Sequence, residues 1–342
     1  MAVYFDERSE FVQISLVPET KKKTISEHLA LHGRYPDTSK TRFQEKRILK
    51  MESSKKLRTV SHLLYAAPFD MGGLPIRQPF PTPKVQQFDP FLLLHHADVK
   101  VPTHIEPDHA GVGPHPHRGF SPVTFIFKGG VHHRDSRGND SVIYAGGAQW
   151  MNAGRGVIHS ERPPKDIHEI GGRQEIIQLW INTPASHKMA QPAYFSAAAD
   201  DVPTKSFDDG RVEVRLFAGE LLGMKGIIAA TSDVNAATIT MQANGRIEVP
   251  VPSSHNVFMY LLDGKISIEG YGLTEGLNAV LFKQDGDSIA FHAVEPTRVL
   301  MMTGLPLEEK VVLQGPFVMN TQTEILEAMR DYQMGKMGML FE

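Results

Sequence analysis

Residues 257–268, VFMYLLDGKISI, carry the pattern that decides the fold. Two apolar runs rich in β-branched and aromatic residues flank Asp263-Gly264, a dipeptide typical of a two-residue hairpin. Similar runs, each bounded by Gly, Pro, Asn or Asp, recur at residues 122–127, 141–144, 176–181, 211–217, 237–241 and 299–302. The pattern predicts an all-β protein built from antiparallel sandwiches or barrels.

Helical periodicity is confined to the C-terminal end of the sequence. Residues 321–333 place apolar side chains at helical spacing, with Asn320 or Thr321 as N-cap and Glu324 in the first turn. Gly335 then supplies a helix stop. We therefore expect one short C-terminal helix.

The organisation of the chain follows from shifts in composition. Residues 1–55 are polar with few clustered apolar positions, which favours a poorly packed or dispensable extension; an ordered arm on a partner subunit is the alternative. The proline-containing stretch 183–204 reads as an irregular connection between two β modules. The expected domains are residues 56–190 and 191–320, followed by a helix and tail at 321–342.

Composition and charge exclude several classes of protein. Among 342 residues, 36 Lys and Arg oppose 39 Asp and Glu, so bulk electrostatic binding to nucleic acid is not expected. The absence of Cys excludes disulfide scaffolds, thiolate metal sites and cysteine nucleophiles. No apolar window of about 18 residues predicts a membrane span, and residues 1–16 do not resemble a secretory signal. The expected compartment is the cytoplasm, and the 16 His direct attention to metal binding.

Two histidine-containing pairs have the spacing of metal ligands. In an extended strand, residues i and i+2 face the same side, so His115 and His117 project together, as do His159 and Glu161. Three imidazoles and a carboxylate suit a divalent transition metal rather than Ca²⁺ or Mg²⁺. Four protein ligands leave coordination positions open for water, dioxygen or substrate, which is typical of a catalytic site. A chance His-x-His in a histidine-rich chain is the alternative.

The runs HPHRGF (115–120), QWMNAGRGVIHSE (149–161) and GPFVMNTQTEI (315–325) together resemble the signatures of the pirin family, within the cupin superfamily. The resemblance spans roughly residues 56–335. It implies a bicupin, two stacked antiparallel β-barrel (jelly-roll) domains with one mononuclear metal in the N-terminal barrel. It also implies the same four metal ligands, namely His115, His117, His159 and Glu161.

The remaining histidines fit the metal pattern less well. His255 and His292 in the second module lie in no H-x-H or H-x-E pair, so no comparable site is expected there. The doublet His132-His133 should point to opposite faces of a strand. His133 and Asp135 have ligand spacing, but the surrounding residues read as a polar turn, so we expect neither to bind metal.

The resemblance implies two functions of different classes. The first is a quercetinase-like dioxygenase that opens a flavonol-type aromatic substrate with dioxygen, with Glu161 as both ligand and proton acceptor. The second is a non-enzymatic iron-binding regulator, a transcription cofactor or redox sensor, that acts through a protein partner; the nucleus is the alternative compartment if the source is eukaryotic. A non-redox cupin catalyst is a third possibility. The expected cofactor is one divalent transition metal, Fe(II) before Mn, Ni, Cu or Zn, and the expected state is a monomer that binds neither nucleic acid nor membrane.

Overall fold

The structure, a computed structural model, describes residues 56–341. The expectations for residues 1–55 therefore lie outside the described residues. Within these described residues there are two short helices, α3 (Lys165–Glu169) and α4 (Gln322–Gln333), with 3₁₀ turns η3 (Pro107–His109), η4 (Ala185–His187) and η5 (Asp208–Gly210). The remaining elements are strands, so the all-β prediction is confirmed.

The strands fall into two groups along the chain. The first comprises β1 (Val60–Tyr65), β2 (Ala67–Met71), β3 (Leu74–Phe80), β4 (Phe91–Lys100), β5 (Val112–His117), β6 (Phe120–Lys128), β7 (Gly130–Asp135), β8 (Asp140–Tyr144), β9 (Ala148–Asn152), β10 (Val157–Arg162), β11 (Arg173–Asn182) and β12 (Ala193–Ala197). The second comprises β13 (Thr204–Phe207), β14 (Val212–Ala218), β15 (Glu220–Leu221), β16 (Met224–Lys225), β17 (Val234–Met241), β18 (Arg246–Pro250), β19 (Asn256–Asp263), β20 (Lys265–Ile268), β21 (Gly272–Glu275), β22 (Asn278–Phe282), β23 (Ser288–Ala293), β24 (Thr297–Gly304), β25 (Val312–Gln314) and β26 (Phe317–Met319). All eight predicted apolar runs lie within strands, apart from Arg211, which directly precedes β14.

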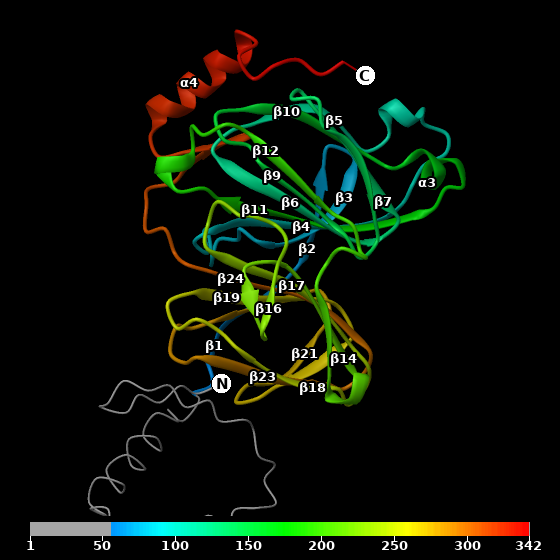
Figure 1. Cartoon of the computed structure of the whole chain (residues 1–342), viewed down its shortest axis with the longest axis vertical. Coiled ribbons are helices and arrows are strands. Elements are labelled where there is room, and N and C mark those ends of the chain that lie inside the picture. Colours follow the sequence, from blue (N-terminus) through cyan, green and yellow to red (C-terminus); the bar gives the residue numbers. More distant parts are fainter. Residues whose placement is uncertain (1–55, 342) are drawn as a thin grey trace, which may run out of the picture. The chain divides into compact units, whose positions relative to one another are not determined.

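The strands build two barrels, each from one large and one small antiparallel sheet (Figure 1). The first barrel combines the seven-stranded sheet β12-β9-β6-β11-β4-β3-β2 with the four-stranded sheet β5-β10-β7-β8. The second combines β1-β22-β19-β24-β17-β14-β13 with β18-β23-β20-β21. This is the bicupin architecture. No described helix is long and apolar enough to cross a membrane.

The two barrels differ in what fills them. One hydrophobic cluster joins the large sheets of both barrels and includes Phe125 and Ile177 from the first, Phe258 and Leu300 from the second. A second cluster of apolar side chains occupies the interior of the second barrel. In strand β11, Ile177 and its alternate residues face the seam between the barrels, which leaves Gln178 and Trp180 pointing into the first barrel. The first barrel therefore keeps polar side chains inside, where the second has an apolar core.

Sheet membership does not follow the expected boundaries along the chain. Strand β1 pairs with β22 of the second barrel, with Leu64 opposite Ala279. Strand β12 lies beyond residue 190 but pairs with β9 of the first barrel, with Phe195 opposite Trp150. A boundary at residue 190 would therefore assign β1 and β12 to the wrong barrels, because strands pair with the available sheet edge and not in the order of the sequence.

The hairpin predicted at Asp263-Gly264 is wrong. Strands β19 and β20 both form, but β19 pairs with β22 and β24, whereas β20 pairs with β21 and β23 in the other sheet. Gly264 has φ +79°, and the chain uses this left-handed residue to turn a corner between sheets. An Asp-Gly dipeptide therefore fits a turn between two sheets as well as a hairpin within one sheet.

The C-terminal segment crosses back to the first barrel. Helix α4 is capped by Thr321, one of the two predicted N-cap residues, whose side chain accepts a hydrogen bond from the Glu324 backbone in a capping box. Before it, the hairpin β25–β26 reaches the first barrel, where the Val318 backbone N–H donates to the Arg118 carbonyl. Figure 1 shows α4 lying over the barrel that contains β5 and β10.

Candidate metal centre

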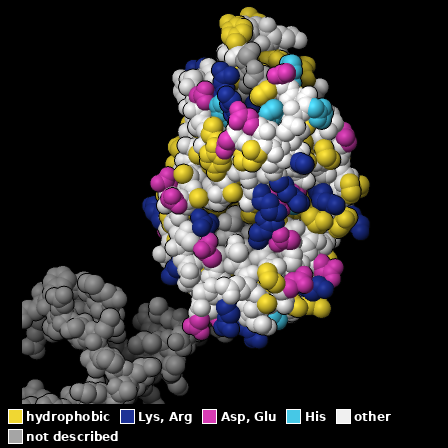
Figure 2. Space-filling model, turned by 90° about the vertical axis from the view of Figure 1, so that its right-hand side faces the viewer, with side chains coloured by type: hydrophobic (Ala, Val, Ile, Leu, Met, Phe, Trp, Pro, Cys, Tyr) yellow, Lys and Arg dark blue, Asp and Glu magenta, His cyan; other side chains and the backbone are white. Residues whose placement is uncertain are grey.

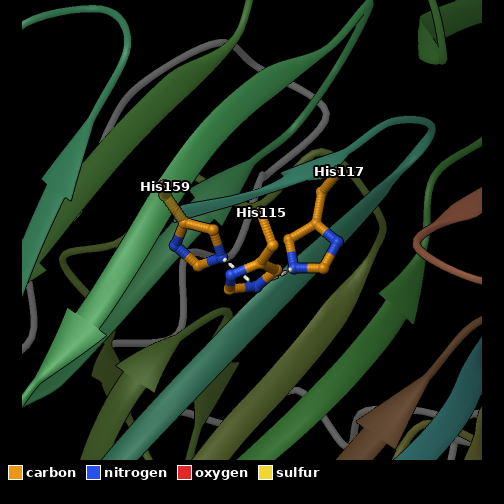
Figure 3. A group of neighbouring side chains, drawn as sticks. All are labelled: His115, His117 and His159. Atoms are coloured by element: carbon orange, nitrogen blue, oxygen red, sulfur yellow. Dashed lines mark hydrogen bonds between the residues drawn. The ribbon is translucent and has the colours of Figure 1, made fainter. Parts of the chain in front are cut away.

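Two neighbouring strands of the small sheet carry the predicted ligands. Strands β5 and β10 pair antiparallel with His115 directly opposite His159, so both side chains point to the same face. His117 is two residues further along β5 and shares that face. The three imidazoles converge inside the first barrel (Figure 3). The alternation of each strand and the register between them are sufficient to assemble the group.

The geometry of the three rings is specific. The Nε2 atom of His115 lies 3.0 Å from Nε2 of His117 and 3.0 Å from Nε2 of His159. The Nδ1 atoms of two rings face carbonyl groups, at 2.8 Å from the Gly113 oxygen for His115 and 3.3 Å from the Pro316 oxygen for His117. A carbonyl can only accept, so both Nδ1 atoms carry the proton. Their Nε2 atoms therefore carry lone pairs, and these lone pairs point toward one another.

Burial keeps two of these rings uncharged. Burial lowers the pKa of His117 and His159 well below its usual value, and the neighbouring imidazoles lower it further. Neutral rings with protonated Nδ1 atoms cannot form hydrogen bonds between their Nε2 atoms. Converging imidazole lone pairs fit a divalent transition metal. Within residues 56–341, these three side chains form the group whose potential ligand atoms all lie within 4.8 Å of one another.

Glu161 is positioned differently from the histidines. It is on β10, two residues beyond His159, but a register irregularity against β5 falls between the two. Its Oε1 accepts a hydrogen bond from Thr124 Oγ1 at 2.7 Å, and its Oε2 accepts one from Gln178 Nε2 at 2.5 Å. Its oxygens are not part of the group within 4.8 Å. Metal ligation by Glu161 thus stays a prediction, while its carboxylate is buried and firmly oriented.

Aromatic rings line one side of the histidine group. The rings of Phe120 and Trp180 lie 4.9 and 5.3 Å from the His117 ring, and 4.2 Å from each other, between centroids. Trp180 Nε1 donates to Gln178 Oε1 at 3.2 Å, so the same glutamine contacts both the indole and the Glu161 carboxylate. An apolar aromatic wall therefore adjoins an oriented carboxylate.

His133 was missed as a residue of this site. It is buried within β7, and its Nδ1 lies 3.4 Å from Nδ1 of His159. Residues 132–135 form the end of a strand, not the turn that the polar composition predicted. The neighbour His132 points outward to Asp140, as the alternation of a doublet predicts. The H-x-D spacing of His133 and Asp135 was the signal, and the expected turn concealed it.

Trp150 and Arg118, which flank the ligands in sequence, contact other parts of the fold. Trp150 belongs to the apolar cluster between the barrels. Arg118 donates from Nε to the Arg155 carbonyl at 2.7 Å and from Nη2 to Asp331 in α4 at 3.0 Å. These contacts join the strands around the site to the C-terminal segment.

A cleft lies elsewhere, at the seam between the barrels. Its volume is about 820 Å³, and none of the three clustered histidines lines it. Figure 2 shows Lys and Arg side chains gathered with acidic ones midway along one face. Within the cleft, Glu175 pairs with Lys128 and Arg298, and Arg173 pairs with Asp98. Mutual pairing makes this a charged seam that joins the barrels.

Gly119 occupies a position next to the site that no other residue fits. It has φ +85°, and a Cβ there would collide with the Val318 carbonyl oxygen and lie 2.8 Å from Met319 Sδ. We expect Gly119→Ala to lower the free energy of unfolding by about 3 kcal/mol, combining backbone strain with overpacking. Thermal unfolding of the parent and of Gly119→Ala measures this loss of stability. The matched control is Gly138→Ala, with φ +90° but open space around it, which isolates the strain. Equal losses in both variants would contradict the steric argument.

Comparison with known proteins places the chain among pirins. Residues 73–181 match the family model described as Pirin, and residues 236–338 match that of the Pirin C-terminal cupin domain. The first range contains β5 and β10, which hold the three histidines. The second contains most of the second barrel and α4.

Individual relatives cover most of the chain. A pirin-like protein of Solanum lycopersicum is 35% identical over 82% of this chain and 92% of its own length. A Pseudomonas aeruginosa protein, whose name gives quercetin 2,3-dioxygenase as a provisional activity, is 34% identical over 78% of this chain and 93% of its own. A solved structure described as quercetin 2,3-dioxygenase from Acinetobacter baumannii is 33% identical, with a TM-score of 0.78 over 84% of this chain and all of that one.

Proposed function

Because this chain belongs to the pirin family, we propose that it is a metal-dependent dioxygenase acting on a flavonol-like aromatic substrate. The observation that carries the proposal is the convergence of three imidazole nitrogens in the first barrel, with Nε2 of His115 3.0 Å from each of the other two. The names of the Pseudomonas and Acinetobacter relatives support the reaction class.

The metal would be held by His115, His117 and His159, with Glu161 as the expected fourth ligand. When bound, a divalent transition metal supplies Lewis acidity and a redox-active centre for dioxygen chemistry. Fe(II) is the proposed metal, and imidazole and carboxylate ligands also suit Mn, Ni, Cu and Zn.

Glu161 is the proposed general base. Each oxygen of its carboxylate accepts one hydrogen bond, Oε1 from Thr124 and Oε2 from Gln178, so the carboxylate has a defined orientation inside the barrel. In this role it accepts the proton of the substrate hydroxyl, which leaves the substrate as an anion. Phe120 and Trp180 provide apolar surface against which a planar aromatic can lie.

The experiment is oxygen consumption with a flavonol by protein loaded separately with Fe(II), Mn(II), Ni(II), Cu(II) or Zn(II). Flavonol-dependent oxygen uptake with a redox-active metal, absent from metal-free protein, is the expected result. Metal uptake without oxygen consumption across several flavonols would instead favour the iron-binding regulator.

Glu161→Gln tests the base. The amide keeps the shape of the side chain and cannot accept the proton, so we expect kcat to fall by about 10²- to 10⁴-fold at saturating metal. Steady-state oxygen uptake measures kcat, and bound metal is measured in the same samples. Glu269→Gln, on the exposed surface of the second barrel, is the control. Unchanged turnover in Glu161→Gln would rule out this carboxylate as the base.

A further inference from the structure

We propose that Asp135 and His133 position the metal ligand His159, by holding it in the tautomer whose Nε2 lone pair faces the other two imidazoles. This inference rests on the metal site of the proposed function and extends it to residues outside the ligand set. It concerns binding of the metal, so it can be tested without catalysis.

The register of two strands places these side chains together. Strands β7 and β10 pair antiparallel, with Asp135 opposite His159 and His133 opposite Glu161. Alternation along each strand directs all four side chains to the same inner face. His133 and Asp135 are 2% and 5% exposed, so the pair is inside the protein.

Asp135 determines which nitrogen of His133 carries the proton. Its Oδ1 accepts from the backbone N–H groups of Arg137 and Asn139, at 2.8 and 3.1 Å. Its Oδ2 accepts from Asn139 Nδ2 at 2.7 Å and lies 3.1 Å from Nε2 of His133. A carboxylate surrounded by donors acts as an acceptor, so Nε2 of His133 donates to it. In the neutral ring, Nδ1 of His133 is then an acceptor.

That acceptor faces His159. The two Nδ1 atoms are 3.4 Å apart, so the Nδ1–H of His159 donates to Nδ1 of His133. With its proton on Nδ1, His159 has its lone pair on Nε2, which is the atom 3.0 Å from Nε2 of His115. His115 and His117 obtain the same tautomer from the carbonyls of Gly113 and Pro316. The Asp135–His133 pair does for the third ring what a carbonyl does for the other two.

Packing fixes the His133 ring in this orientation. The ring stacks on Tyr194 of β12, with centroids 4.1 Å apart and planes at 11°. The Tyr194 hydroxyl lies 2.7 Å from Ser141 Oγ on β8. A purely structural role for His133 would therefore depend on ring volume, whereas the positioning role depends on an acceptor at Nδ1.

Three variants separate the two roles. His133→Phe keeps an aromatic ring against Tyr194 but removes the acceptor. His133→Asn loses the ring but can place a carbonyl oxygen near the position of Nδ1. Asp135→Asn leaves His133 in place and offers its Nε2 an amide donor, which reverses the tautomer. The controls are His132→Phe and Asp140→Asn, in a His–Asp pair on the outer face of the same hairpin.

The readout is Co(II) binding to the full chain, measured by chelator competition and by the visible absorption of the bound Co(II), with no substrate present. We expect His133→Phe and Asp135→Asn to weaken Co(II) binding by about 10- to 100-fold and to change the visible spectrum. His133→Asn should bind Co(II) more tightly than His133→Phe, and both controls should match the parent. Melting temperatures of the metal-free proteins check that each variant folds.

Two results with the variants would overturn the proposal: parental Co(II) affinity in Asp135→Asn, or tighter binding by His133→Phe than by His133→Asn. If His133→Phe does not fold, Asp135→Asn decides the question alone. A parent protein that takes up no Co(II) would refute the metal site and this positioning role together. A parent that binds Co(II) tightly, but consumes no oxygen with any flavonol when loaded with a redox-active metal, would refute the proposed activity and leave this inference standing.

Discussion

His117→Ala should abolish metal-dependent turnover and lower metal affinity by roughly 10²-fold or more. Structural sites bind Zn²⁺ with about 10–16 kcal/mol from four ligands, or roughly 3 kcal/mol for each ligand. The His117 ring is held on several sides, because it is 2% exposed, packs against Phe120 and Trp180, and donates to the Pro316 carbonyl. Its loss removes a ligand and opens the aromatic wall.

Thermal unfolding provides a second measurement of the same prediction. Metal at 100 times its dissociation constant should stabilise the parent by about 2.7 kcal/mol, and this gain should shrink in His117→Ala. The control is His292→Ala, in the small sheet of the second barrel. Undiminished metal-dependent stabilisation in His117→Ala would show that the metal binds elsewhere.

Glu175→Gln should produce the largest loss of stability at the seam between the barrels, about 3 kcal/mol. Glu175 is 3% exposed by its side chain and receives two hydrogen bonds from Arg298 of the second barrel, at 2.7 and 2.9 Å. Lys128 lies 3.0 Å from the same carboxylate. Removing one partner of a buried ion pair leaves the other charges without compensation. Chemical unfolding at neutral pH measures the loss.

The pH dependence of this loss has a defined sign. Burial alone raises the pKa of Glu175, but the contacts of its carboxylate with His96, Arg298 and Lys128 outweigh burial and hold the pKa well below its usual value. A lowered folded pKa contributes stability above the unfolded pKa of about 4.3, and this contribution is lost as the pH falls further. The difference between parent and Glu175→Gln should therefore be constant from pH 7 to 5 and shrink below pH 4.

The exposed pair Lys265–Glu275 offers the control for the seam. Its glutamate side chain is 70% exposed and pairs with Lys265 at 2.7 Å, at the rim of the same cleft. Surface ion pairs of this kind contribute little, so Glu275→Gln should unfold at the same denaturant concentration as the parent. A loss as large as that of Glu175→Gln would contradict the importance of burial.

The two ligand pairs of the histidine group were predictable because they depend on local rules, whereas the register that joins them is given by the structure. The alternation of strands selects His115 with His117, and one antiparallel register brings His159 opposite His115. The capping box of α4 was predictable for the same reason, since Thr321 and Glu324 are three residues apart. The fold class followed from turn residues between short apolar runs.

Features that depend on distant pairing were not predictable. Asp263-Gly264 has hairpin chemistry, but the two strands it joins belong to different sheets. Strand β1 finds its partner β22 more than two hundred residues away. The polar neighbours of His133 predict a turn, but the structure has a strand there whose inner face lies against His159. Local propensity does not determine which sheet edge is available.

The Pro316 carbonyl has a consequence for the biosynthesis of the protein. His117 and Pro316 are 199 residues apart, and Pro316 lies on the hairpin that returns from the second barrel to the first. A ribosome completes every strand of the first barrel long before it adds Pro316. We expect a nascent chain at that stage to lack the carbonyl that fixes the His117 tautomer. Full metal affinity should thus be acquired only when translation has passed the C-terminal hairpin, so loading follows completion of the chain.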